Sequence, residues 1–330
     1  MRYQALAGFE PLRRALAHRV RLTRGVDASP EQVVITSGAQ QAIDLVTRLL
    51  VNHQDSVAIE DPGYTPAACL FAASGVRVVP VPVDDNGIIV SQIPPHVRMV
   101  YTTPSHQAPT GVVMSMQRRQ DLLAFADQHS VAVIEDDYDS EYRHADRPLE
   151  PLYRLDQSGR VIYIGTFSKT LSPSLRLGFV VLPESLIEPA TTLRSLMDWQ
   201  PPLSMQTALL RLIVDGHLDR HLRHSRKVYT QRHGMVSQFV ETAVTQKLLA
   251  SAPRSYAGLH LSAFLPPGVR EEKVRQEAQT KGLALTSFAD CWHGPTTTEG
   301  VIIGFGAIAT QALPEALAVL SEVLHSCTKS

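Results

Sequence analysis

Apolar residues recur along the chain with two different periods, and these periods alternate over its first half. Short runs rich in β-branched residues predict buried strands at residues 33–35, 56–59, 76–83, 97–102, 130–134, 161–164 and 177–182. Apolar positions at helical spacing predict helices at residues 11–20, 41–51 and 116–128. Strands that alternate with helices favour an α/β fold with a mostly parallel sheet covered by helices.

The pattern changes after residue 182. Long stretches of helical spacing cover residues 183–202, 204–214 and 217–240. Strand-like runs at residues 259–265, 283–285 and 301–305 then alternate with helical stretches at residues 271–281 and 313–324. We therefore expect two domains, a large one at residues 1–222 and a smaller C-terminal α/β domain at residues 223–330.

The composition excludes several classes of protein. With 330 residues, 44% hydrophobic and 19% charged, the chain is typical of ordinary globular proteins and long enough for two cores. A net charge of −1 gives no electrostatic footprint for nucleic acid or an anionic membrane. The three cysteines are widely spaced, and neither a secretory leader nor a membrane-length apolar run is evident. These features favour a cytoplasmic protein.

The strand at residues 161–164 delivers the most distinctive group of side chains. It ends at Gly165 and is followed by Thr166, Ser168 and Lys169, with Arg176 further on. The carboxyl ends of strands in an open α/β sheet face the ligand crevice, so Lys169 is expected to project into it. An amine beside hydroxyls and an arginine suits a nucleophile next to a bound phosphate. A surface lysine in a polar turn is the alternative.

Three other loops follow predicted strands and add complementary chemistry. Ser-Gly-Ala-Gln at residues 37–40 precedes a helix, where free backbone N–H groups either bind an anion or are simply capped. Tyr64 can present its ring to a planar ligand. Asp136 can pair with a protonated ring nitrogen, or belong to a solvated acidic turn. Together the loops predict a phosphorylated, planar, cationic aldehyde, pyridoxal 5′-phosphate, bound as a Schiff base to Lys169.

Two weaker motifs compete with this interpretation. Residues 304–309 fit a relaxed dinucleotide fingerprint and would support a nicotinamide oxidoreductase, but no acidic residue follows at the expected offset. His217 and His221 lie one helical turn apart, yet the sequence offers no evident third ligand. We therefore predict no metal site.

The motifs also carry a family resemblance that covers nearly the full length. The segments ITSGAQQAIDL, EDPGY, TPSHQAPTG, EDDYDSEYR and GTFSKTLSPSLRLG resemble fold-type-I, pyridoxal-phosphate-dependent aminotransferases of class I/II. The similarity is greatest to the aminotransferase-like domain of MocR-type transcriptional regulators, which are related to the GntR family. The winged helix-turn-helix of those regulators is expected to be absent, since the sequence begins where their second domain begins.

The resemblance implies a role for each candidate residue. It makes Lys169 the lysine that forms the Schiff base, Asp136 the partner of the pyridine nitrogen, and Tyr138 a hydrogen-bond partner of the ring hydroxyl oxygen. The stacking aromatic would be Tyr64, and the phosphate would be held by Gly38, Ala39, Gln40, Thr166 and Arg176. Tyr3 matches a tyrosine that reaches the phosphate of the neighbouring subunit, which implies a homodimer with a shared active site.

Three positions depart from the family pattern. Ala108 replaces the asparagine that usually precedes Pro-Thr-Gly, Ile302 occupies the place of the carboxylate-binding arginine, and Pro66 stands where a related regulator is expected to carry an arginine. A missing bidentate clamp weakens both the orientation and the affinity of an α-carboxylate. The expected function is transamination, at least its half-reaction, of an amino acid or primary amine. The alternative is an effector-sensing domain of a MocR-type regulator with little turnover.

Overall fold

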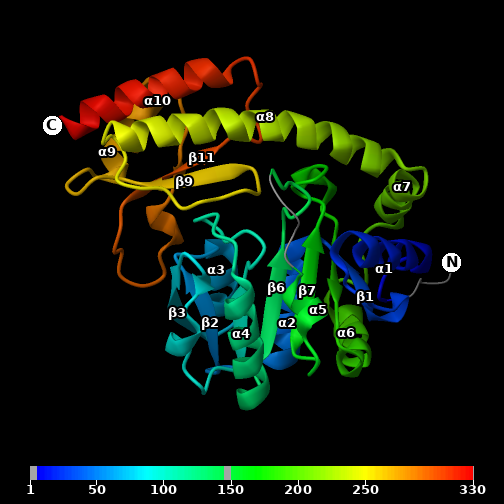
Figure 1. Cartoon of the computed structure of the whole chain (residues 1–330). Coiled ribbons are helices and arrows are strands. Elements are labelled where there is room, and N and C mark those ends of the chain that lie inside the picture. Colours follow the sequence, from blue (N-terminus) through cyan, green and yellow to red (C-terminus); the bar gives the residue numbers. More distant parts are fainter. Residues whose placement is uncertain (1–5, 145–149, 330) are drawn as a thin grey trace.

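The large part of the protein is built on one eight-stranded sheet with the strand order β1-β8-β7-β6-β5-β2-β3-β4 (Figure 1). This computed structural model describes residues 6–144 and 150–329. The strands β7, β6, β5, β2 and β3 pair in parallel, whereas β8 pairs antiparallel with both β7 and β1. The mostly parallel sheet predicted from the sequence is thus confirmed. The strand bounds are β1 Val33–Thr36, β2 Ser56–Asp61, β3 Arg77–Asp84, β4 Gly87–Ile88, β5 Met99–Thr102, β6 Ala132–Asp137, β7 Val161–Thr166 and β8 Gly178–Val181.

Helices cover both faces of this sheet, which is why its central strands are buried along their whole length. Every residue of β1, β2, β5, β7 and β8 is buried, as expected for strands enclosed on two sides. One core lies between the sheet and α2, α3 and α6, and another lies between the sheet and α4. The helix bounds are α1 Glu10–Arg24, α2 Ala39–Leu50, α3 Thr65–Ala73, α4 Met116–His129, α5 Leu152–Leu155 and α6 Glu184–Met197.

Helix α3 has no counterpart among the elements predicted from the sequence. Its residues, TPAACLFAA, are nearly all apolar or small, so they show no amphipathic period that would indicate a helix. The helix forms because Ala67, Ala68 and Phe71 pack into the core beside α2. Tertiary burial, and not a local pattern, decides this element.

The smaller part contains a three-stranded antiparallel sheet with the order β10-β11-β9. A separate core, formed with α8, α9 and α10, covers it. The strand predicted at residues 283–285 is wrong, because Leu283 and Leu285 pack on this core without a partner strand, and the ladder starts at β10. The bounds are α7 Leu203–Val214, α8 His217–Thr245, β9 His260–Phe264, α9 Glu271–Thr280, β10 Thr286–Ser287, β11 Gly300–Gly304 and α10 Leu313–Thr328.

The same sheet argues against the nicotinamide alternative. The glycines at residues 304 and 306 follow β11, whose two neighbours β9 and β10 both run antiparallel to it. A dinucleotide fingerprint needs a parallel strand–helix–strand unit, in which the glycine-rich turn leads to the phosphate-binding helix. Residues 304–309 therefore lack the structural context that their sequence suggested.

Helix α8 joins the two parts without a break (Figure 1). Near its start, Leu218 and Leu222 pack against the large sheet, whereas Val236 and Val240 belong to the small core. The predicted boundary at residue 222 falls within this helix, so the division into domains 1–222 and 223–330 stays a prediction.

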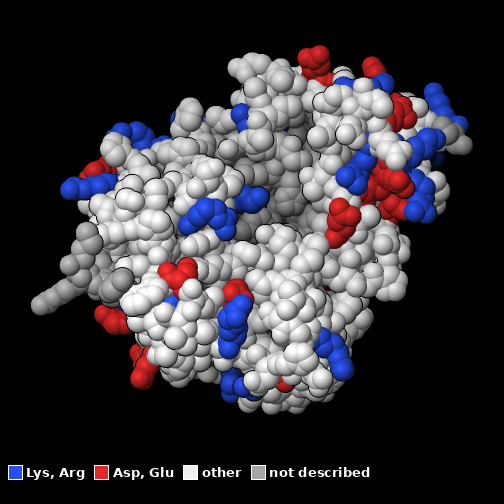
Figure 2. Space-filling view, turned by 180° about the vertical axis from the view of Figure 1, so that it is seen from behind, with Lys and Arg blue, Asp and Glu red and all other residues white. Residues whose placement is uncertain are grey.

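The face of the molecule drawn in Figure 2 carries charged side chains of both signs. In Figure 2, basic and acidic side chains are interspersed over the face that is drawn, in keeping with the net charge of −1. Within the part of the chain that the structure describes, none of the helices combines the length and apolarity needed to span a bilayer.

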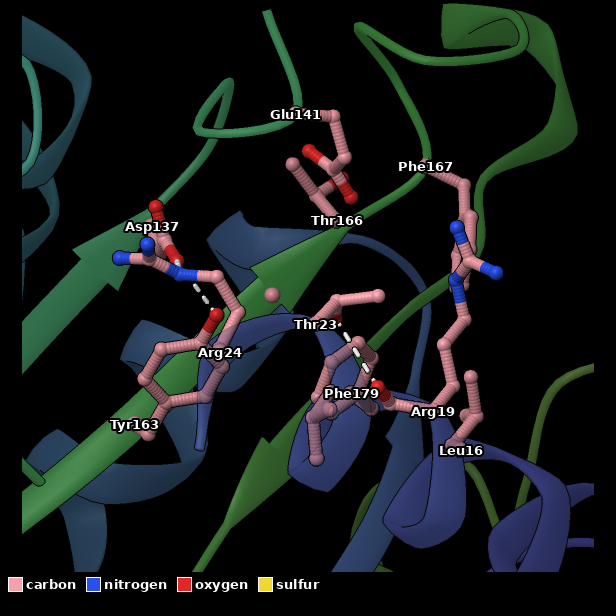
Figure 3. Close-up of a pocket in the computed structure, with 12 residues that line it drawn as sticks. Leu16, Arg19, Thr23, Arg24, Asp137, Glu141, Tyr163, Thr166, Phe167 and Phe179 are labelled. Carbon is pink, nitrogen blue, oxygen red and sulfur yellow. Dashed lines mark hydrogen bonds and ion pairs between the residues drawn. The ribbon is translucent and has the colours of Figure 1, made fainter. Parts of the chain in front are cut away.

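A buried ion pair anchors α1 to the sheet next to the predicted site. Arg24 donates from Nε to Asp137 Oδ2 at 2.8 Å, and the Tyr163 hydroxyl donates to the same oxygen at 2.5 Å. Both charged side chains are buried, with 7% of Arg24 and 0% of Asp137 exposed. They line a small cavity of about 20 Å³, with Glu141 and Thr166 on its other side (Figure 3). Because Asp137 is buried, its charge depends on Arg24 for compensation.

Replacing Arg24→Ala is expected to lower the free energy of unfolding by about 3–5 kcal/mol, since it leaves a buried carboxylate unpaired. The matched control is Arg21→Ala on the same helix, where the ion pair with Asp27 is 4.0 Å long and both partners are more than half exposed. That control should cost about 0–1 kcal/mol. Urea denaturation measures both values, and equal costs would contradict the role of burial.

Candidate functional site

The sheet register brings the predicted loops to a single edge. Asp136 on β6 is paired with Ile164 on β7, and the chain continues from β7 through Thr166 to Lys169. Thr166 lies opposite Gly178, which in turn lies opposite Thr36 at the end of β1. Because β1, β6 and β7 all point the same way, the loops that follow them meet at their carboxyl ends, where open α/β sheets bind ligands.

Asp136 is a buried carboxylate that has only one of its oxygens satisfied. Its side chain accepts a hydrogen bond from the Tyr101 hydroxyl at Oδ2, over 2.7 Å, whereas the buried Oδ1 has no hydrogen-bond partner. Burial raises the pKa of Asp136 to about 7, while the hydrogen bond from Tyr101 opposes that rise. A cationic N–H donor placed at Oδ1 would satisfy this oxygen and favour the ionised carboxylate.

The start of α2 and Arg176 form an anion-binding arrangement. Gly38 precedes the helix with a φ of +88°, and a Cβ at this position would lie 3.3 Å from the Arg176 guanidinium. Arg176 donates to the Ser37 carbonyl oxygen at 2.8 Å, which holds its positive charge against the helix N-terminus. Thr166 Oγ1 and Ser168 Oγ, hydrogen-bonded to each other at 3.1 Å, lie at the end of the neighbouring β7. Free N–H groups, an arginine and hydroxyls suit a phosphate.

Gln40 contributes to this arrangement less directly. Its Nε2 donates to the Pro66 carbonyl oxygen at 2.7 Å, and its Oε1 is buried without a hydrogen-bond partner. The side chain thus links α2 to the first turn of α3. Ala39 is the first residue of α2, so its backbone N–H is among those left unsatisfied at a helix N-terminus.

Tyr64 and Lys169 are exposed, unlike Asp136. Tyr64 caps α3 and is 37% exposed. Its pKa is raised by burial and by the charge of Asp136, and Arg176 acts in the opposite direction. The Tyr64 hydroxyl is therefore within electrostatic reach of both the carboxylate and the arginine. Lys169 is exposed beyond β7, where its amine is accessible to a ligand.

Tyr138 belongs to a buried polar group that the sequence analysis did not anticipate. Its hydroxyl lies 3.0 Å from His106 Nδ1, and the same nitrogen lies 2.9 Å from Asp139 Oδ2. His106 and Asp139 are only 1% and 2% exposed. Asp139 belongs to the acidic run at residues 136–141, and its partner His106 lies 33 residues away in the sequence, so the pair could not be identified from sequence alone.

Tyr101 is a further residue beside the candidate site that the sequence left unassigned. It is 0% exposed on β5, adjacent to β6, and reaches Asp136 along the sheet. A tyrosine inside a buried strand needs a hydrogen-bond partner for its hydroxyl, and this requirement is the sequence signal that could have drawn attention to Tyr101. The residue that accepts the hydrogen bond depends on strand order.

The remaining predicted residues have separate outcomes. Ile302 is 7% exposed on β11, opposite Ser262, and Ala108 donates from its backbone N–H to Thr103 Oγ1. Tyr3 lies outside the described residues. His221 donates from Nε2 to the Thr170 carbonyl oxygen at 2.8 Å, next to Lys169. The described part of the chain contains no group of three or more residues suited to a metal.

The raised pKa of Asp136 predicts a pH-dependent stability in the cofactor-free protein. Between its ordinary value of 3.8 and about 7, the folded state holds a proton that the unfolded state has lost. Stability should therefore fall as the pH rises through this window, by about 4 kcal/mol, and Asp136→Asn should remove this dependence. Urea denaturation at a series of pH values measures the difference. Identical pH profiles for the two proteins would contradict the assignment.

A companion variant tests the role of Tyr101. Tyr101→Phe removes a hydrogen bond that favours ionised Asp136, so the upper end of the pH window should move to higher pH.

Comparison with known proteins places this arrangement in a family. The sequence matches aminotransferase class I and II over residues 1–252. It is 35% identical to the probable rhizopine catabolism regulatory protein MocR of Rhizobium meliloti, over 96% of this chain and 64% of that protein. The chain thus spans a little less than two thirds of that regulator. It is also 31% identical to aromatic-amino-acid aminotransferase 1 of Thermococcus litoralis, over 86% of this chain and 70% of that enzyme.

Solved structures agree with the sequence matches. The kynurenine aminotransferase of Pyrococcus horikoshii, solved in complex with PMP, superposes with a TM-score of 0.88 at 29% identity, covering 99% of this chain and 82% of that one. The multiple substrate aminotransferase of Thermococcus profundus gives a TM-score of 0.88 at 27% identity, covering 100% and 84%. Fold, site geometry and sequence agree, and the chain belongs to the aminotransferase class I and II family, which implies pyridoxal phosphate as its cofactor.

Proposed function

We propose that the protein binds pyridoxal phosphate through Lys169 and catalyses at least the half-reaction of transamination on an amino acid or primary amine. The observation that carries this proposal is Asp136, a buried carboxylate with an unpartnered oxygen beside the strand that leads to an exposed lysine. An exposed surface acid would not need a cationic partner. A buried one does, and a protonated ring nitrogen fits it.

Each residue of the site has a distinct task in this proposal. The cofactor, when bound, supplies an electron-accepting ring that weakens the Cα–H bond of an attached amine. Asp136 keeps the ring nitrogen protonated, and the Lys169 amine attaches the cofactor and later moves the substrate proton as general base and acid. Tyr138 donates to the ring hydroxyl oxygen and Tyr64 stacks on the ring. Gly38, Ala39, Gln40, Thr166 and Arg176 hold the phosphate.

A second candidate function is effector sensing with little turnover. It is favoured by the positions that would hold a substrate carboxylate, because Ala108 and Ile302 offer no cation and no side-chain amide. The resemblance to MocR, a regulator that this chain covers over 64% of its length, points the same way. The same site would then report an amine by binding it, without rapid release of product.

A homodimer is part of the proposal. Several large apolar side chains are exposed on α1, α6, α7 and the turn between α6 and α7, and a second copy could cover them. They are Leu22, Leu196, Trp199, Leu203 and Val214. A groove of about 610 Å³ lies between α1 and α7 and is lined by Pro11, Ala15, Leu210 and Val214 among others. Tyr3 would reach the partner's phosphate in this dimer.

The lysine assignment is tested by Lys169→Ala. The variant should fold but lose the borohydride-reducible attachment of added pyridoxal phosphate, since its Nζ forms the bond. Lys273→Ala, which removes an exposed lysine of α9, is the control and should keep the attachment. Mass spectrometry after reduction measures the adduct, and an adduct that persists in Lys169→Ala would show that another amine is used.

Turnover separates the two candidate functions. The protein loaded with pyridoxal phosphate is mixed with 2-oxoglutarate and a panel of amines with and without an α-carboxylate. We expect sustained formation of the keto or aldehyde product, and a preference for amines without the carboxylate, because of Ala108 and Ile302. A single spectral change with no product beyond one equivalent would instead support the sensor.

A further inference from the structure

A buried network behind Tyr138 determines where its hydroxyl proton can point. His106 Nδ1 lies 2.9 Å from Asp139 Oδ2 and 3.0 Å from the Tyr138 oxygen, and His106 Nε2 lies 3.2 Å from Ser255 Oγ. A carboxylate only accepts hydrogen bonds, so the proton on this side of the imidazole must be on Nδ1. This holds whether the ring is neutral or positively charged.

The position of Nδ1–H dictates the role of Tyr138. The tyrosine oxygen lies at hydrogen-bond distance from a nitrogen that already carries a proton, so toward His106 it accepts and cannot donate. Its own proton is left for another acceptor. With the opposite tautomer, Nδ1 would be a lone pair and the Tyr138 proton would be drawn to it.

The surrounding structure holds the imidazole in this orientation. The His260 ring packs against it with centroids 4.8 Å apart. Gly258 has a φ of +78°, and a Cβ there would lie 2.0 Å from His106 Cε1 and 2.6 Å from Asp139 Oδ2. Only glycine leaves room for the pair. Ser255, His260 and Gly258 come from the segment that leads into and begins β9, so this segment helps to set the histidine.

The charged and polar groups near the Tyr138 hydroxyl agree with a donor role. Burial is the main reason why its pKa is well above the usual value, and Asp139, Asp136, Glu60 and Asp137 raise the pKa further. The hydroxyl therefore keeps its proton.

We propose that Asp139 and His106 are positioning residues that leave the Tyr138 proton available for the ring hydroxyl oxygen of bound pyridoxal phosphate. The proposal rests on the proposed function, because it needs the cofactor in the crevice. Asp139 and His106 are both buried, and in this proposal they act through Tyr138 and not by contact with the cofactor. A hydrogen bond from Tyr138 to the anionic ring oxygen favours its ionised form. The positioning residues should therefore influence the pH at which the bound cofactor changes its visible absorption.

The test follows the pH midpoint of the visible absorption change of the protein loaded with pyridoxal phosphate. Tyr138→Phe should raise this midpoint by about one to two pH units, the size of one hydrogen bond to a charged acceptor. Asp139→Leu should raise it similarly, because His106 can then place its proton on Nε2 and accept from Tyr138. Asp139→Asn keeps a weaker acceptor and should give a smaller upward shift.

The double variant distinguishes positioning from general disruption. In Tyr138→Phe combined with an Asp139 substitution, the midpoint should equal that of Tyr138→Phe alone, since there is no longer a proton to direct. Shifts that add, or an Asp139→Asn midpoint equal to that of the wild type, would overturn the proposal even if Asp139→Leu fails to fold. Tyr142→Phe is the matched control, a buried tyrosine bonded to the Thr170 carbonyl oxygen, and should leave the midpoint unchanged.

Failure of the proposed function gives a different result. If wild-type protein mixed with pyridoxal phosphate develops no visible band and no borohydride-reducible adduct, the cofactor assignment itself is wrong. A wild-type band with a midpoint that ignores Asp139 would leave the function standing and remove only the positioning role.

Discussion

The arrangement of this protein depends on a carboxylate kept out of water. Asp136 is 3% exposed, lies in the middle strands of the sheet, and has one oxygen held by Tyr101 while the other has no hydrogen-bond partner. Leaving a buried acceptor unsatisfied is costly, and burial makes the ionised form unfavourable until a cation arrives. A protonated heterocycle would satisfy this oxygen, and the exposed amine and the candidate anion-binding loop lie at the same edge of the sheet.

The two parts of the molecule meet around the loop that carries His106. The Pro109 carbonyl oxygen accepts hydrogen bonds from His260 Nε2 at 2.9 Å and from Ser262 Oγ at 2.5 Å, both on β9. Burial lowers the pKa of His260 to about 4, so near neutral pH this contact is made by a neutral imidazole. The loop therefore connects the small sheet with the network behind Tyr138. Any movement of β9 relative to the large sheet would act on the residues that orient that tyrosine.

Membership of the family is compatible with both turnover and sensing. The two functions differ in what they require at the positions that would bind a substrate carboxylate. The side chains proposed to handle the cofactor lie among the described residues, apart from Tyr3. The positions that would orient a substrate carboxylate are Ala108 and Ile302. Attachment of an amine depends on the first set, whereas rapid turnover of α-amino acids also depends on the second. A site with the first set alone can serve either an enzyme for other amines or a regulator.

Local patterns were enough to determine the α/β class, most elements and the candidate side chains that follow strand ends. They succeeded because a buried strand, a glycine and a reactive side chain are close in sequence, as in the segment from Val161 to Lys169. They failed for α3, whose uniform apolarity has no period, and for Leu283 and Leu285, which are apolar but unpaired. Tyr101, His106 and Asp139 gained their roles only in the folded chain. Their partners lie 35, 32 and 33 residues away, and strand order and the packing of β9 bring them together. Sequence determined which residues could react, and tertiary structure decided which of them share a proton, because hydrogen bonds depend on distances that the chain alone does not set.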